Sequence, residues 1–223
     1  MNDNLTPHKT SDYDREVIRT IPYYDQFHSE TISLINVLNP GVTTWLDTGC
    51  GTGKLIEKTL IEFPQCTFYL SDPSENMLSV CTEKFKNRPV KLLGKYQTSE
   101  IQSDIHFAVI TAIQSHHYMD FEGRISTTDH CYNLLKSKGI YITFENIRPE
   151  SREGIETGLK RWGIFQRKQG RSEDVVKNHL NRFDKDYFPI TVNEHLDILR
   201  RAGFRVAELF WMSYMQAGFY AIK

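Results

Sequence analysis

The sequence contains little cysteine, and its cysteines are not arranged to pair or to bind metal. Four cysteines occur among 223 residues, and no two of them form a C-x-x-C motif or stand at metal-ligand spacing from a histidine. We therefore expect free thiols in a reducing compartment and no metal site. A zinc site built from His116, His117 and His130 is the alternative.

Long apolar runs and an excess of one charge are absent as well. No run approaches the roughly 20 apolar residues of a membrane span, and the polar residues 1–16 lack the apolar centre of a signal peptide. Lys and Arg total 27 against 28 Asp and Glu, a net charge of −1. Proteins that bind nucleic acid through its phosphates usually carry a basic excess, so nucleic acid is not the expected partner. We predict a cytoplasmic monomer or homodimer without membrane contact.

The sequence does contain a regular alternation of apolar runs and amphipathic stretches. We expect strands at 42–47, 66–72, 90–94, 105–113, 139–146, 204–212 and 216–223, and helices at 54–63, 74–85, 124–137 (stopped by Gly139) and 193–203. Repeated strand–helix–strand units predict a doubly wound α/β fold, with a parallel sheet and helices on both faces. The last two runs are expected to pair antiparallel.

One domain with four parts accounts for this length. Residues 1–39 are expected to form an N-terminal helical cap, in which Pro22 separates two helices. Residues 40–147 form the cofactor-binding core, and residues 191–223 supply a helix and a strand pair. Residues 148–190 interrupt the alternation, and we interpret them as a helical lid inserted over the open edge of the site.

A glycine-rich segment, LDTGCGTG (46–53), follows the first predicted strand and opens the next helix. Its G-x-G-x-G spacing lets the backbone turn tightly and approach a ligand at a helix N-terminus. Dinucleotide enzymes use G-x-G-x-x-G for a pyrophosphate. Asp47 at the strand end would repel a diphosphate but attract an ammonium or sulfonium cation. These features disfavour a nicotinamide-dependent reductase.

A second acidic residue ends the next strand. Asp72, in LSDPSENML, stands 25 positions after Asp47 and is placed to accept the two hydroxyls of a ribose. Met77, on the first turn of the following helix, is placed to pack beside an adenine. A glycine loop followed by a strand-terminal acid within one βαβ unit is a specific signal for a nucleoside ligand.

These residues make the chain resemble the class I S-adenosylmethionine-dependent methyltransferases. LDTGCGTG and LSDPSENML are similar to the first two motifs of that family, and DIHFAVITAIQSHHY and KSKGIYITFENIRP to its fourth and fifth strands. AGFRVAELF and AGFYAIK are similar to its last two strands, so the resemblance covers about residues 40–147 and 190–223. It implies a mostly parallel seven-stranded sheet with an antiparallel last strand. It also implies S-adenosyl-L-methionine as cofactor and S-adenosyl-L-homocysteine as its product.

The resemblance also implies a set of cofactor-binding residues. Asp47, Gly49 and Gly51 would line the methionine part, Asp72 would bind the ribose, and Pro73 and Met77 would flank the adenine. Cys50, Gly53, Ala112 and Gln114 complete the expected site. Many members carry an acidic residue after the third strand, near the adenine amine. This chain has none there, and we expect Tyr96 or Gln97 in its place.

Residues near the transferred methyl group follow no fixed pattern. His116 and His117 come after the fourth strand, at the edge where ligands bind, and either is a candidate base for an acceptor hydroxyl or amine. Loop capping or packing is the alternative for both. The acceptor-binding candidates are Tyr13, Tyr24, Glu145, Arg161 and Trp162. Because Arg161 and Trp162 lie in a basic insertion, an anionic or aromatic acceptor is one interpretation, and a solvated helix face is the other.

Methyl transfer to a small-molecule acceptor, by in-line displacement at the sulfonium, is the leading hypothesis. One alternative is a tRNA-modification enzyme that uses S-adenosylmethionine or a carboxylated derivative. The segment Ile21–Tyr24 is similar to the N-terminal region of the tRNA-uridine carboxy-S-adenosylmethionine synthases. The other alternative is a non-catalytic cofactor-binding or scaffold protein, which the intact glycine loop and Asp72 oppose.

The Asp72→Ala variant tests the predicted nucleoside site. We expect micromolar binding of S-adenosylhomocysteine and none of NADH by calorimetry. The substitution should weaken S-adenosylhomocysteine binding by about 1–3 kcal/mol, because it leaves polar ligand groups unpaired. Unchanged affinity in Asp72→Ala would contradict the assignment.

Overall fold

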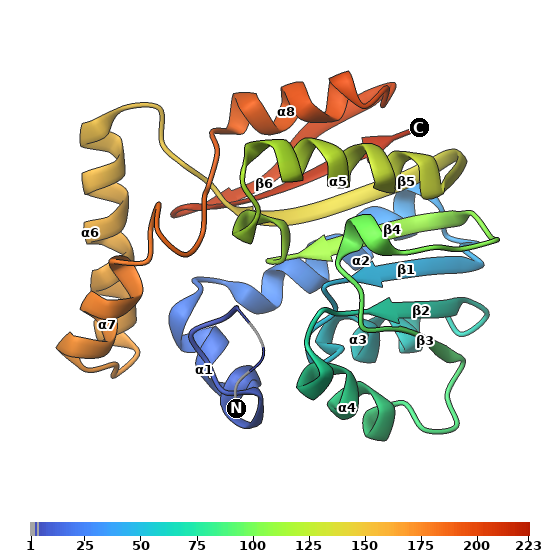
Figure 1. Ribbon diagram of the computed structural model, residues 1–223, viewed down its shortest axis with the longest axis horizontal. Coiled ribbons are helices and arrows are strands. Elements are labelled where there is room, and N and C mark those ends of the chain that lie inside the picture. Colours follow the sequence, from blue (N-terminus) through green and yellow to red (C-terminus); the bar gives the residue numbers. More distant parts are fainter. Residues whose placement is uncertain (1–2, 4) are drawn as a thin grey trace.

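One seven-stranded sheet forms the centre of the molecule (Figure 1). The computed structural model describes residue 3 and residues 5–223. The strands are β1 (Thr44–Thr48), β2 (Thr67–Ser71), β3 (Val90–Gly94), β4 (Phe107–Ile113), β5 (Leu135–Asn146), β6 (Val206–Ser213) and β7 (Gln216–Ile222). Their order is β3-β2-β1-β4-β5-β7-β6. Strand β7 is antiparallel to both neighbours and the other pairs are parallel, so the predicted doubly wound fold is confirmed.

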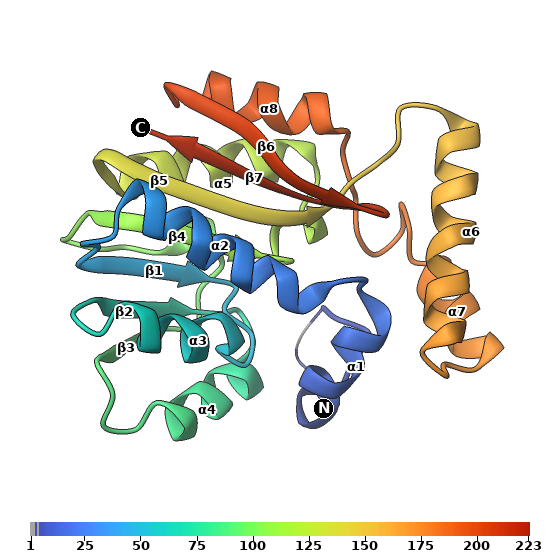
Figure 2. The same cartoon turned by 180° about the vertical axis from the view of Figure 1, so that it is seen from behind.

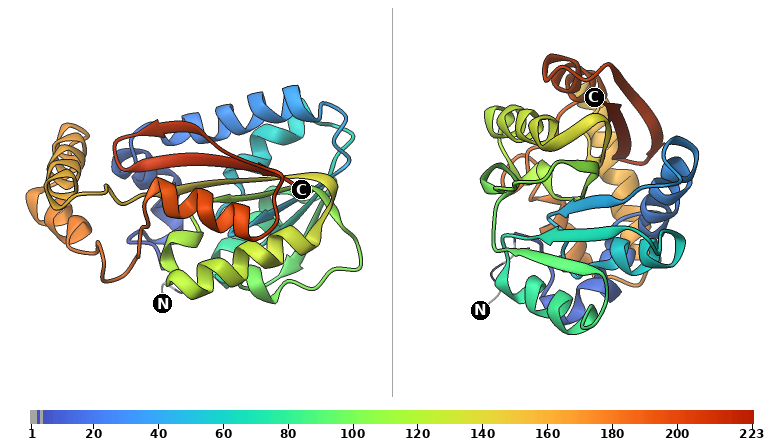
Figure 3. Two further views of the ribbon diagram at one scale, coloured as in Figure 1. Left: turned by 90° about the horizontal axis from the view of Figure 1, so that it is seen from above. Right: turned by 90° about the vertical axis from the view of Figure 1, so that its right-hand side faces the viewer.

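Helices cover both faces of this sheet (Figure 3). They are α1 (Tyr13–Thr20), α2 (Tyr24–Leu38), α3 (Lys54–Glu62), α4 (Glu75–Lys84), α5 (Phe121–Leu134), α6 (Arg152–Lys168), α7 (Glu173–Leu180) and α8 (Val192–Arg201), with short 3-10 turns η1 (Thr10–Asp12), η2 (Thr98–Glu100) and η3 (His116–Tyr118). Helices α2 and α3 lie on one face, and α5 and α8 on the other. No helix within residues 3 and 5–223 has the length and apolar character needed to cross a bilayer.

The two layers of the core follow from the alternation of side chains along buried strands. Trp45 of β1 packs with the apolar residues of α2 and α3, and its neighbour Leu46 packs with those of α5 and α8. Successive strand residues point to opposite faces, so a strand buried on both sides is apolar throughout. This explains why the apolar runs of the sequence located the parallel strands.

The strand order reverses next to β1, and this positions the site. Strand β1 pairs with β2 on one side, where Thr48 is opposite Ser71, and with β4 on the other, where Asp47 is opposite Thr111. The loops after β1, β2 and β4 therefore meet at one edge. In open α/β sheets, ligands bind in the crevice at such a reversal.

The structure differs from the expected elements before the fifth strand. The helix expected at 124–137 is α5, which begins at Phe121 and ends at Leu134, so Gly139 does not stop it. The Asp120 side chain sets its start by accepting a hydrogen bond from the backbone nitrogen of Gly123 at 2.8 Å. Leu135 is already extended and pairs with β4, so β5 begins four residues earlier than expected.

Residues 148–190 form helices α6 and α7, which project beyond the carboxyl ends of the strands (Figures 1 and 2). Trp162 of α6 is fully buried, and its indole nitrogen donates to the carbonyl of Thr20 at 2.6 Å. Arg19 of α1 donates to the carbonyls of Gln169 and Gly170 at 3.0 Å. The insertion is thus helical, as expected, but it is fastened to the N-terminal cap.

The Trp162→Phe variant tests this attachment. It leaves a Thr20 carbonyl without its donor and removes buried ring surface, so the free energy of unfolding should fall by about 2 kcal/mol. Urea denaturation measures the change. Ile164→Val, on the exposed side of the same helix, is the control and should change stability by less than about 0.5 kcal/mol. Equal stability of both variants would show that the contact contributes nothing.

Candidate functional site

The loop after β1 has a backbone that only glycine adopts readily. Gly49, Gly51 and Gly53 have φ angles of +63°, +56° and +73°. Gly49 is also packed so closely that an added Cβ would lie 2.4 Å from the Cβ of Ser115. An added Cβ at Gly53 would lie 2.5 Å from the ring of Phe85. Conformation therefore favours glycine at all three positions, and close approach also requires it at Gly49 and Gly53.

Asp72 follows β2 and joins its end to the glycine loop. One carboxylate oxygen accepts from the backbone nitrogen of Gly51 at 2.8 Å, and the other from that of Ser74 at 2.8 Å. Burial raises the pKa of Asp72, and the two amide hydrogen bonds oppose that rise. Ser74 in turn caps α4 by accepting from the nitrogen of Met77. These hydrogen bonds therefore fix the carboxylate at the edge where the strand order reverses, without the help of a ligand.

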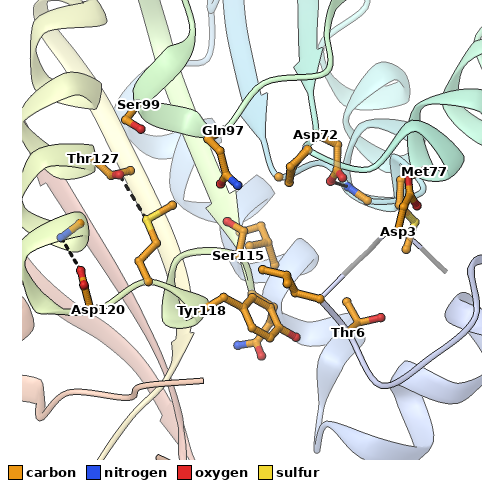
Figure 4. Close-up of a pocket in the computed structure, with 18 of the residues that line it drawn as sticks. Asp3, Thr6, Asp72, Met77, Gln97, Ser99, Ser115, Tyr118, Asp120 and Thr127 are labelled. Atoms are coloured by element: carbon orange, nitrogen blue, oxygen red, sulfur yellow. Dashed lines mark hydrogen bonds between the residues drawn. The ribbon is translucent and has the colours of Figure 1, made fainter. Parts of the chain in front are cut away.

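A cavity of about 550 Å³ opens between these loops (Figure 4). Of the residues predicted to bind cofactor or acceptor, those that line it are Tyr13, Gly49, Gly51, Asp72, Pro73, Met77, Gln97 and Gln114. Residues that the sequence did not single out also line it: Asp3, Leu5 and Thr6 from the N-terminal segment, and Ser99, Ile113, Ser115, Tyr118, Met119, Asp120, Gly123, Ser126 and Thr127. We call this space the main cavity.

The N-terminal segment contributes to the wall of the main cavity, through Asp3, Leu5 and Thr6. Asp3 accepts from the Ser74 hydroxyl at 2.6 Å and from the backbone nitrogen of Glu75 at 2.8 Å, at the start of α4. No residue of 148–190 lines the main cavity. The role of the insertion as a lid stays a prediction.

Gln97 and Tyr96 take different places at the end of β3. Gln97 lines the main cavity, and Figure 4 shows its side chain directed inward. The Tyr96 side chain is 42% exposed and does not line the cavity. Of the two residues proposed to replace the missing acid, only Gln97 is positioned to reach a ligand.

A chamber of about 20 Å³ adjoins the main cavity at the glycine loop. Asp47, Tyr24, His28 and Cys50 line it, and Tyr13 lines both spaces. Asp47 is buried, accepts from the Thr111 hydroxyl at 2.7 Å, and has its pKa raised by burial to about 7. A cationic group placed beside Asp47 would stabilise its ionised form.

The two candidate catalytic histidines do not reach the main cavity. His116 contacts the hydroxyls of Thr98 and Tyr141, each at 3.0 Å. His117 contacts Glu145 through Nδ1 at 2.9 Å. Burial lowers the pKa of both rings, which favours their neutral forms. His116 is packed away from the main cavity, whereas His117 also lines a small recess beside it, so the catalytic role of either ring stays a prediction.

Glu145 is part of this buried network and does not line the main cavity. It accepts from the backbone nitrogens of His116 and His117 and from the hydroxyl of Thr143 at 2.6 Å. Burial raises the pKa of Glu145, but the hydrogen bond from His117 and the charge of Arg124 oppose burial and hold the pKa below its usual value. We therefore assign Glu145 as an ionised anchor for the loop after β4.

The remaining predicted residues lie outside the main cavity. Ala112 is fully buried in the core, and Gly53 packs on α4. Arg161, on α6, stacks on the ring of Tyr214, with its guanidinium carbon 3.9 Å from the ring centroid, and it does not line the main cavity. In the described part of the chain, no group of three or more His, Cys, Asp or Glu side chains is arranged to hold a metal ion. His130, the third histidine of the zinc alternative, contacts the carbonyl of Ile101 at 2.8 Å.

Residues 46–141 match a family model described as a methyltransferase domain. Over most of its length, the chain is also similar to carboxy-S-adenosyl-L-methionine synthases. It is 22% identical to the enzyme of Campylobacter lari, over 88% of this chain and 84% of that protein. It is 27% identical to that of Wolinella succinogenes, over 91% of this chain and 86% of that protein.

Solved methyltransferases have the same fold. The plantazolicin methyltransferase BpumL, solved with a substrate analogue and S-adenosylhomocysteine, matches with a TM-score of 0.73 at 14% identity, over 97% of this chain and 91% of that chain. The magnesium protoporphyrin IX methyltransferase of Synechocystis, also solved with S-adenosylhomocysteine, matches with a TM-score of 0.65 at 15% identity, over 96% and 94%. Residues 46–141 are thus similar to a methyltransferase domain, and the chain as a whole has the class I fold of these solved methyltransferases.

The pKa of Asp47 predicts a pH dependence for ligand binding. Protonated Asp47 cannot attract the ammonium group of S-adenosylhomocysteine, so affinity should rise about tenfold from pH 6 to pH 8 as a group with a pKa of about 7 ionises. Calorimetry should also show proton release on binding near pH 7. Asp47→Asn should bind weakly at every pH. If the wild-type affinity stays constant over this pH range, Asp47 does not interact with the ligand.

Proposed function

From a methyltransferase domain with this crevice, we propose that the protein binds S-adenosylmethionine and transfers its methyl group to a small-molecule acceptor. One observation carries the proposal: the glycine loop, the Asp72 carboxylate and Gln97 line one cavity of about 550 Å³. That volume lies within the usual range of small-molecule sites. Enzymes similar in fold, such as BpumL, were solved with S-adenosylhomocysteine and act as methyltransferases.

The residues present fit this cofactor. Asp72 offers a fixed carboxylate for the ribose hydroxyls, and Gln97 offers an amide for the adenine edge. Met77 supplies an apolar surface for the ring, and Asp47 an acid for the ammonium end. When bound, the cofactor supplies an electrophilic methyl group on a sulfonium.

We assign the acceptor to the part of the main cavity that a cofactor bound by these residues would leave free. Tyr118, Met119, Ser126 and Thr127 line it, from the loop after β4 and the first turns of α5. His116 and His117 stand outside it, so the contribution we assign to the chain is alignment of the acceptor with the sulfonium. The cytoplasmic location and the monomeric or homodimeric state remain predictions.

Formation of a carboxylated cofactor is the second candidate function. The carboxy-S-adenosyl-L-methionine synthases of Campylobacter lari and Wolinella succinogenes align with about nine tenths of this chain. The segment Ile21–Tyr24 resembles the N-terminal region of such synthases. It reaches the site, because Tyr24 lines the chamber beside Asp47. This alternative would add a carboxyl group to the cofactor and transfer no methyl group.

Mass spectrometry of reaction products separates the two candidates. The protein is incubated with S-adenosylmethionine and a pool of small hydroxy, amino and carboxylic acids, or with S-adenosylmethionine and prephenate. We expect S-adenosylhomocysteine and a product heavier by one methylene from the first mixture. A cofactor heavier by one CO₂ from the second mixture would support the alternative and contradict methyl transfer.

Two aspartate variants, one at the site and one away from it, provide a matched test and control. Asp72→Ala should slow turnover at low S-adenosylmethionine concentration by about tenfold or more, because the ribose loses its carboxylate partner. Asp104→Asn alters an exposed acid without hydrogen bonds in the described residues and should leave turnover unchanged. Circular dichroism checks that both variants are folded. Equal loss in both would remove the evidence for a specific site.

A further inference from the structure

A small polar recess lies next to the main cavity. Its volume is about 30 Å³, and Thr6, Tyr13, Gln114 and Tyr118 line both spaces. One water needs about 10–15 Å³, so the recess has room for about two oxygen-sized groups. Of the residues proposed to bind cofactor, only Gln114 borders it. The recess is therefore a separate compartment that an acceptor in the main cavity can reach.

Two residues that line the recess each carry a buried donor without a partner among the described residues. The Tyr187 hydroxyl is one, in a residue only 2% exposed, and the amide nitrogen of Gln114 is the other; neither has a hydrogen-bond partner within residues 3 and 5–223. Each buried unpaired donor costs about 1–3 kcal/mol. Gln114 also has a φ of +55°, an uncommon conformation for a residue other than glycine. Unpaired donors on a strained backbone are typical of a place that a ligand completes.

A buried network fixes a third donor, His179 of α7. Arg171 donates to the amide oxygen of Gln166 at 2.6 Å, which turns the amide nitrogen of Gln166 toward Nδ1 of His179 at 3.0 Å. Because that nitrogen donates, Nδ1 accepts and the neutral imidazole carries its proton on Nε2. Burial lowers the pKa of His179 well below its usual value, which keeps the ring neutral. His179 lines the recess with an N–H to offer.

The charge around the recess is positive. Arg182 lines it, and its outer side pairs with the half-exposed Asp186 at 2.7 Å. Arg171 is buried behind Thr20, to whose hydroxyl it donates at 2.6 Å. Among the described residues no carboxylate pairs with Arg171 directly, and the nearby charge of Glu16, which pairs with Arg19, offsets its charge only from a distance. No Asp or Glu side chain from that part lines the recess. A buried guanidinium without a directly paired carboxylate is costly, and a bound anion would reduce that cost.

We propose that the recess binds the carboxylate of the acceptor, while the body of the acceptor occupies the main cavity. This rests on the proposed function and deepens it, because it names the substrate class as a small carboxylic acid. A carboxylate offers about four acceptor positions to the donors of Tyr187, Gln114 and His179. Its charge offsets Arg171 and Arg182. Its two oxygens match the volume, which is too small for a tetrahedral phosphate.

The experiment uses benzoate and benzamide as matched probes of similar shape and different charge. Each is titrated into the full-length protein saturated with S-adenosylhomocysteine, and binding is followed by NMR. We expect saturable binding of benzoate and at least tenfold weaker binding of benzamide. Tyr187→Phe should weaken benzoate binding about fivefold to tenfold. It should leave S-adenosylhomocysteine affinity unchanged and should not lower the Tm, because the hydroxyl has no partner to lose in the free protein.

Tyr96→Phe is the control, because its side chain is exposed and borders neither space. It should change neither affinity. Equal binding of the two probes, no binding of benzoate, or the same benzoate affinity in wild type and Tyr187→Phe would each overturn the recess as a carboxylate site. In those cases, S-adenosylhomocysteine binding would leave the proposed function intact. Failure to bind S-adenosylhomocysteine would instead contradict the proposed function itself.

Discussion

The hydrogen bond from the Gly51 amide to the Asp72 carboxylate joins the ends of the first two strands, and the site depends on it. The two residues are 21 positions apart, and the parallel pairing of β1 with β2 brings them together. The bond forms only if the loop backbone adopts positive φ angles, which explains the glycines at alternate positions. It holds the buried Asp72 carboxylate next to the glycine-rich backbone, at the point where the strand order of the sheet reverses. The crevice therefore exists before a ligand enters.

Tyr13 connects this core to the rest of the molecule, because it lines the main cavity, the chamber beside Asp47 and the recess. Its helix is held from two sides. Asp14 accepts from the Thr52 hydroxyl in the glycine loop at 2.6 Å, and Thr20 is bound by Trp162 and Arg171 of the insertion. The insertion thus acts on the site through α1. It also supplies side chains to the recess that we propose for the acceptor carboxylate, while the strand ends supply those that we propose for the cofactor.

The fold and the cofactor side of the site were predictable from sequence because their signals are local. Gly51 and Asp72 lie at strand ends, and β-strand periodicity together with glycine spacing specifies where such ends are. The same reasoning located His116 and His117 at the end of β4 but not the direction of their rings. The His117 ring bonds Glu145, and the His116 ring bonds Thr98 and Tyr141. A strand end identifies an edge of the sheet and does not determine which way a side chain points.

Acceptor residues depend on contacts between distant segments, and no periodic pattern marks them. Asp3 is in a polar tail whose sequence predicts no structure, yet it binds the start of α4. His179 and Tyr187 come from the insertion and meet Gln114 of the core only through tertiary packing. Trp162 is an example of a misleading signal. As an aromatic residue in a basic segment it suggested a ligand site, but its indole donates to the Thr20 carbonyl of α1.

A crystal structure of the protein with S-adenosylhomocysteine tests the central claim most directly. The account predicts the nucleoside in the main cavity, with the ribose hydroxyls about 2.6–3.2 Å from the Asp72 carboxylate and the glycine loop against the homocysteine end. A nucleoside bound elsewhere, or a crevice that stays empty at saturating ligand, would contradict it.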